Sequence, residues 1–91
     1  MKGLLPEEQI AARLKQVPGW ERSGAQIRRT YSFGSFKEAM AFANRVAEAA
    51  EAADHHPDIL VQYRKVTLTL TSHDAGGLTE RDFRLAQRID G

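Results

Sequence analysis

The segment from Val66 to Thr71 constrains the fold of this chain more than any other. Three apolar residues alternate there with three threonines, in the order Val66, Thr67, Leu68, Thr69, Leu70 and Thr71. Because side chains alternate between the two faces of a β-strand, this pattern predicts a strand with one apolar and one polar face. Such a strand belongs in an antiparallel sheet that is covered on one side only. The chain has 91 residues and no cysteine, so we expect a single domain over residues 1–91 with one hydrophobic core.

Three helices are predicted around this strand. Pro6 opens the first, with Ile10, Ala11, Leu14 and Val17 on one side, and Pro18-Gly19 ends it. The Ser35-x-x-Glu38 and Thr79-x-x-Asp82 patterns are capping boxes that begin two further helices. The long middle helix must end before Pro57, and its predicted apolar positions are Phe36, Met40, Ala43, Val46, Ala47, Ala50 and Ala53.

Alternating patterns predict three more strands. Residues 20–33 form a hairpin that is interrupted at Ser23-Gly24, and residues 59–63 form the strand before Val66. Trp20 and Tyr63 are expected in the core, since a small domain buries its large aromatic residues. The resulting fold class is α+β, in the order α-β-β-α-β-β-α, with three helices on one face of a four-stranded antiparallel sheet.

Composition excludes several kinds of function. The 13 Lys and Arg residues balance 12 Asp and Glu residues, for a formal charge of +1, which gives no basis for nonspecific binding to nucleic acid or an anionic membrane. Without cysteine there is no thiol nucleophile and no cysteine-based metal site. No stretch approaches the roughly 18 apolar residues of a membrane span, and no signal peptide is recognisable, so we expect a cytoplasmic protein.

All three histidines fall between positions 55 and 73. His55 and His56 follow the predicted long helix, while His73 has the strand parity of the threonines and so lies on or at the rim of the open face. Histidine can act as both acid and base near neutral pH, so the group is a candidate catalytic site. A structural role at the helix end and a metal site are the alternatives, although adjacent histidines are poor chelators within regular structure.

The residues around the histidines resemble a known family. The arrangement Glu51-x3-His55-His56-Pro57-x5-Tyr63-x9-His73-x8-Asp82, together with the stretch from Ser72 to Asp82, is similar to the signature of the pterin-4a-carbinolamine dehydratases. The resemblance extends in looser form over nearly the whole chain. This family also contains the dimerisation cofactor of a homeodomain transcription factor.

The resemblance implies a lyase that removes water from 4a-hydroxytetrahydropterin to give quinonoid dihydropterin, during tetrahydrobiopterin recycling. His55 and His73 would be the acid/base pair, and His56 would orient the pterin or share in the proton transfer. Asp82 would orient His73, although it could equally serve only to close its capping box. Substrate-binding residues would be His55, His56, Pro57, Ser72, His73, Asp74 and Ala75, with Glu51 and Arg81 in support. The reaction needs no metal or redox cofactor.

The resemblance also implies partners. Relatives form dimers or tetramers through helices and sheet edges, so a homodimer or homotetramer is expected, without direct contact to nucleic acid or membrane. The alternative function is a non-catalytic protein-binding module on the same fold, which would act in transcription-factor dimerisation or as an assembly factor.

Overall fold

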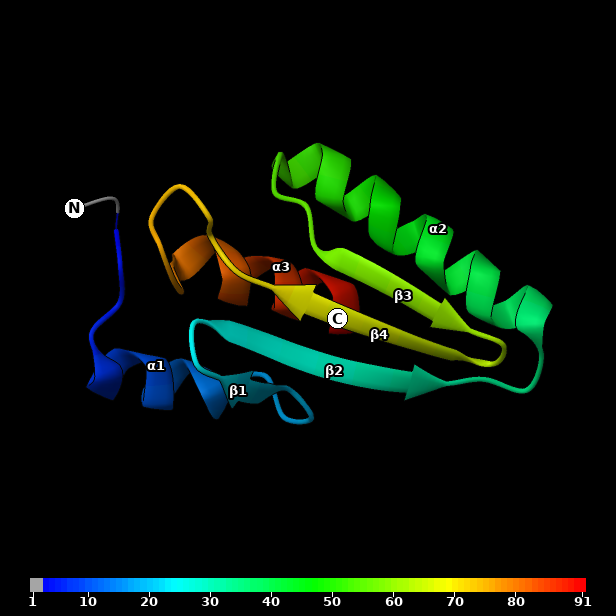
Figure 1. Ribbon diagram of the computed structural model, residues 1–91, viewed down its shortest axis with the longest axis horizontal. Helices are drawn as coiled ribbons and strands as arrows, with labels where there is room; N and C mark the ends of the chain where they lie inside the picture. Colours follow the sequence, from blue (N-terminus) through cyan, green and yellow to red (C-terminus); the bar gives the residue numbers. More distant parts are fainter. Residues whose placement is uncertain (1–2) are drawn as a thin grey trace.

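The alternating segment forms strand β4, Lys65–Leu70, in a computed structural model that describes residues 3–91. Val66, Leu68 and Leu70 are fully buried, as predicted. The other elements are α1 (Glu7–Leu14), β1 (Glu21–Ser23), β2 (Gln26–Ser32), α2 (Phe36–Ala53), β3 (Asp58–Gln62) and α3 (Glu80–Asp90). The predicted α+β class and element order are confirmed (Figure 1).

The four strands form one antiparallel sheet in the order β1-β2-β4-β3. β4 lies between its neighbours, where Leu70 pairs with Ile27 of β2 and Leu68 with Ile59 of β3. On the side of Ile27, Val66, Leu68 and Leu70, all three helices contribute residues to a single core, among them Ile10, Val46 and Phe83. The opposite face carries the threonines, and Thr30 and Thr67 form a hydrogen bond across it (Oγ1–Oγ1 2.9 Å).

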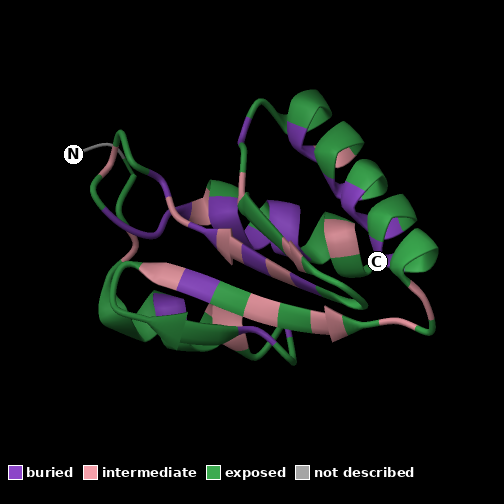
Figure 2. Cartoon of the chain, turned by 45° about the vertical axis from the view of Figure 1, so that its right-hand side comes forward, coloured by how far each residue is buried: buried purple, intermediate pink, exposed green. Residues whose placement is uncertain are grey.

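The predicted buried face of α2 is confirmed at Ala43, Val46 and Ala50 and wrong at its four other positions. Its buried residues are Ala39, Phe42, Ala43, Val46 and Ala50, whereas Phe36, Met40, Ala47 and Ala53 are exposed. The Phe42 ring packs against Tyr31 and Phe33, with ring centroids 4.6 Å and 5.1 Å apart, and this aromatic contact sets the rotation of the helix. Figure 2 shows the resulting exposed outer side of α2.

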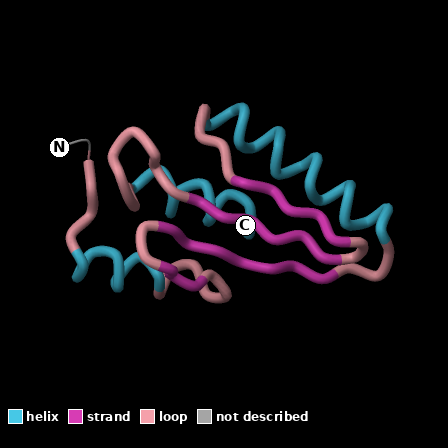
Figure 3. Tube along the Cα trace, viewed as in Figure 1, coloured by secondary structure: helices cyan, strands magenta, loops and turns pink. Residues whose placement is uncertain are grey.

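Two further sequence predictions are wrong in detail. The first helix ends at Leu14, because residues 15–17 continue in tighter turns, although Val17 is still buried; Ala11 is exposed. Trp20 is buried as expected, but Tyr63 is 68% exposed and has a positive φ of 54°. It lies in the tight turn between β3 and β4, which needs a left-handed residue (Figure 3).

The carboxylate of Asp90 ties the first half of the chain to the end of α3. It accepts hydrogen bonds from Trp20 Nε1 (2.8 Å), the Tyr31 hydroxyl and Arg29 (3.0 Å). Burial, reinforced by this bond to Asp90, raises the pKa of Tyr31 well above its usual value. Arg29 lies on the apolar side of β2. Its side chain is accommodated there because its guanidinium lies over the Tyr31 ring.

Candidate active site

The end of α2 positions His55. Asp54 adopts the left-handed conformation (φ 50°, ψ 42°), and its N–H bonds to Ala50 and Glu51 carbonyls while the His55 N–H donates to the Ala50 carbonyl (3.1 Å). This is the Schellman pattern of helix termination, here with Asp in the place that glycine usually takes. The reversal directs the His55 side chain inward, where the residue is only 8% exposed.

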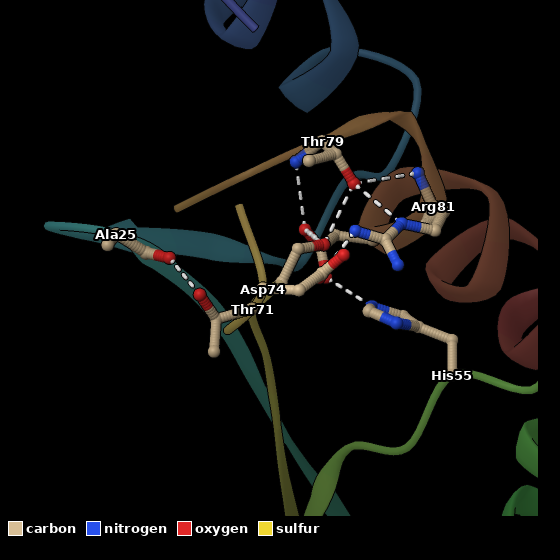
Figure 4. A network of polar contacts seen from close by, with 8 residues as sticks. Ala25, His55, Thr71, Asp74, Thr79 and Arg81 are labelled. Atoms are coloured by element: carbon tan, nitrogen blue, oxygen red, sulfur yellow. Dashed lines mark hydrogen bonds and ion pairs between the residues drawn. The ribbon is translucent and has the colours of Figure 1, made fainter. Parts of the chain in front are cut away.

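The inward side chain of His55 meets Asp82, which is fully buried at the start of α3. Their closest atoms, His55 Nε2 and Asp82 Oδ1, are 2.6 Å apart. The second oxygen of Asp82 accepts hydrogen bonds from the Thr79 N–H and the Ser72 hydroxyl, both at 2.9 Å. The predicted capping box of α3 is therefore confirmed, and its carboxylate also holds a histidine (Figure 4).

These contacts form a chain with a defined direction. Arg81 donates to the Thr79 hydroxyl, so the Thr79 hydrogen is left for Ser72 (2.8 Å), whose own hydrogen goes to Asp82. A carboxylate only accepts hydrogen bonds, so the proton between Asp82 and His55 is carried by His55 Nε2. In neutral His55 the other ring nitrogen, Nδ1, then holds the lone pair and can act as a base.

His73 lies in the loop after β4, which is closed by a bridge between Ser72 and Gly77 and turns at Gly76 (φ 78°). Because β3 runs antiparallel to β4 with Asp58 opposite Thr69, this loop lies at the same end of the sheet as the segment leaving α2 (Figure 1). The exposed His73 thereby shares a cleft of ≈ 260 Å³ with the other two histidines. This histidine cleft is lined by Asp54, His55, His56, Thr71, His73, Asp74 and Arg81.

Side chains around the histidine cleft form further polar contacts. His56 Nε2 lies 2.5 Å from Glu51 Oε2 in an exposed pair. Arg81 binds Asp74 across the cleft margin (2.7 Å), and Thr71 donates to the Ala25 carbonyl (2.6 Å).

The structure corrects one predicted contact and reassigns others. Asp82 was expected to orient His73, but its oxygens contact His55, Ser72 and Thr79. Ser72 is fully buried behind the histidine cleft, and Pro57 and Ala75 do not belong to the lining. Asp54 and Thr71 do belong to it; the polar strand parity of Thr71 was a usable signal, whereas nothing local marked Asp54.

The residues from 3 to 91 contain no group of three His, Cys, Asp or Glu side chains arranged to hold a metal ion. In the same range, none of the helices combines the length and apolarity that a bilayer crossing requires.

Comparison with known families decides where the chain belongs. The family described as Pterin 4 alpha carbinolamine dehydratase matches residues 3–91. The chain belongs to the pterin-4-alpha-carbinolamine dehydratase family. Curated members include a protein of Thermomicrobium roseum, 56% identical over 93% of this chain and 91% of its own, and one of Nocardia farcinica, 56% identical over 96% and 92%. Both carry the dehydratase name provisionally.

Two solved structures are similar to this chain. The transcriptional coactivator/pterin dehydratase of Brucella melitensis is 32% identical, covers 94% of both chains and superposes with a TM-score of 0.90. A pterin dehydratase-like protein described as a RuBisCO assembly factor in the alpha-carboxysome is 25% identical, covers 78% of this chain and 82% of its own, and has a TM-score of 0.63.

Proposed function

We propose that the chain is a 4a-hydroxytetrahydropterin dehydratase that works by histidine acid/base catalysis. The observation that carries the proposal is the convergence of His55 and His73 on one cleft, with His55 held by the buried Asp82. A fixed imidazole that shares a cleft with a second, exposed histidine is suited to moving protons on a bound heterocycle. The product would be quinonoid dihydropterin, as tetrahydrobiopterin recycling requires.

The reaction breaks the N5–H and C4a–O bonds and forms the C4a=N5 double bond. His55 Nδ1, which carries the lone pair, takes the proton from N5. Protonated His73 gives its proton to the departing oxygen, which leaves as water. The electron pair of the N5–H bond becomes the new double bond, and proton exchange with solvent restores both histidines.

The remaining side chains of the site position His55 and His73. Asp82 fixes the tautomer of His55 and stabilises its imidazolium after proton transfer. His56, with Glu51, orients the pterin at the outer edge, and Asp74 with Arg81 holds the loop that carries His73. Each positioned proton transfer contributes about 10²–10⁴-fold to the rate.

The direct test is dehydration of freshly generated 4a-hydroxytetrahydropterin by the purified wild-type protein. We expect the rate to exceed the spontaneous dehydration by at least about 10²-fold. A rate equal to the spontaneous one would contradict the proposal. Elemental analysis of the same preparation should show less than stoichiometric zinc or iron; a stoichiometric amount would contradict the metal-free mechanism.

A second candidate function is a protein-binding module. Phe36 and Met40 on α2 are 52% and 37% exposed, and the names of two structural relatives include a coactivator and an assembly factor. A stoichiometric protein partner together with absent turnover would favour this function over catalysis.

A further inference from the structure

A second cleft, whose lining does not include His73, borders His55. It has a volume of ≈ 460 Å³ and is lined by Ala53 at the end of α2, by His55, and by Arg81, Arg84, Leu85 and Arg88 of α3. We call it the arginine cleft. His55 and Arg81 line both this cleft and the histidine cleft, so the two adjoin at the proposed catalytic base.

The charge of the arginine cleft is only partly compensated by carboxylates of residues 3–91. Its lining contains three arginines at helical spacing and no carboxylate. Arg81 is paired with Asp74, but within residues 3–91 the guanidinium groups of Arg84 and Arg88 form no hydrogen bond or ion pair. Three other arginines are paired with carboxylates, namely Arg13 with Glu80, Arg22 with Glu7 and Arg29 with Asp90.

Two guanidinium groups that have no partner among residues 3–91, in a cleft that also has apolar lining residues, fit a phosphate group. Guanidinium presents parallel N–H donors that match the oxygens of a phosphate, and the bonds are charge-assisted. Ala53 and Leu85 supply the apolar part of the lining. The arginine cleft can thus hold a short apolar linker that ends in a phosphate.

The chemistry of the substrate connects the two clefts. In a tetrahydropterin, N5 is bonded both to C4a, where water leaves, and to C6, which carries the side chain. A base that takes the N5 proton therefore lies near the root of that side chain. Since His55 borders both clefts, a C6 side chain that leaves the histidine cleft past His55 reaches the arginine cleft, whose lining includes Arg84 and Arg88.

We propose that the arginine cleft binds a phosphate on the C6 side chain, so that the preferred substrate is a phosphorylated pterin. This inference rests on the proposed function, because it takes the orientation of the pterin from the role of His55. Arg84 and Arg88 are then specificity-determining residues, and they discriminate between substrates through the side chain instead of the ring.

The test compares two ligands that differ only in the phosphate, dihydroneopterin and dihydroneopterin monophosphate, by calorimetry at low salt. We expect the wild-type protein to bind the phosphorylated ligand at least about tenfold more tightly. The double variant Arg84→Gln/Arg88→Gln should remove this difference. The matched control Arg28→Gln/Arg64→Gln, which loses the same charge from β2 and the β3–β4 turn, should retain it.

Equal affinity of the wild-type protein for the two ligands would overturn the inference, and so would a preference that survives in the double variant. Inorganic phosphate and ATP are titrated in parallel. If either binds as tightly as the phosphorylated pterin with the same dependence on Arg84 and Arg88, the cleft serves another anion and the assignment to the side chain is wrong. Wild-type turnover is measured separately, so failure of the dehydratase proposal is distinguished from failure of this one.

Discussion

At the scale of single residues, Asp82 combines two roles that are usually separate. One oxygen closes the capping box of α3 and accepts from Ser72, while the other faces His55. The capping box was predictable because its two residues are three positions apart. The contact with His55 was not, because it joins residues 27 positions apart and depends on how α2 and α3 pack.

Replacing Asp82 by Asn tests both roles. An amide of the same shape has one accepting oxygen for three donors, so one donor is left facing the amide NH2 group. We expect turnover to fall by at least about 10²-fold and the free energy of unfolding by about 1–3 kcal/mol. Nitrogen NMR of the histidine side chains should show His55 protonated at Nε2 in the wild-type protein and altered in the variant.

Asp58→Asn, an exposed change of the same chemistry on β3, is the control and should alter neither quantity. A purely structural role for Asp82 would appear as lower stability with unchanged turnover and an unchanged His55 signal.

At the scale of elements, the termination of α2 determines where His55 lies. The sequence predicted that this helix ends before Pro57, since proline excludes the helical conformation before it. It could not predict that Asp54 takes the left-handed conformation, because that follows from the carbonyl bonds of the whole last turn. The buried face of α2 was predicted only in part, at Ala43, Val46 and Ala50, since periodicity alone did not reveal that Phe42 meets Tyr31 and Phe33.

Substitutions at Asp54 test this termination. Asp54→Gly should keep the free energy of unfolding within about 1 kcal/mol of the wild-type value, since glycine accepts a positive φ. Asp54→Val should lower it by about 1–2 kcal/mol, because a β-branched residue clashes there. Urea denaturation measures both, and a valine variant as stable as the wild type would show that the reversal does not depend on this residue.

At the scale of the whole molecule, the strand order places the site and leaves apolar surface uncovered. The antiparallel register of β3 and β4 brings the histidine segments together from two loops; the sequence predicted the two strands but not this register. The same order makes β3 an edge strand. Leu60 on β3 is 52% exposed, like Phe36 on α2, and exposed apolar residues on a small protein are typical of an interface.

We therefore predict self-association. Sedimentation should give a species at least twice the 10.2 kDa of one chain, and Phe36→Glu/Met40→Glu should shift it toward the single-chain mass. Gln9→Glu/Ala12→Glu on the exposed side of α1 adds the same charge and should leave the mass unchanged. A wild-type protein that sediments only at 10.2 kDa would refute the prediction.

The central claim is that His55 and His73 carry out the dehydration, and single-turnover assays of His55→Ala and His73→Ala test it most directly. We predict that each variant dehydrates 4a-hydroxytetrahydropterin about 10²–10⁴-fold more slowly than the wild type, while circular dichroism shows the fold retained. His55→Gln, which keeps a donor for Asp82, guards against a loss caused by unfolding alone and should be similarly slow. Near wild-type rates in both alanine variants would contradict the account.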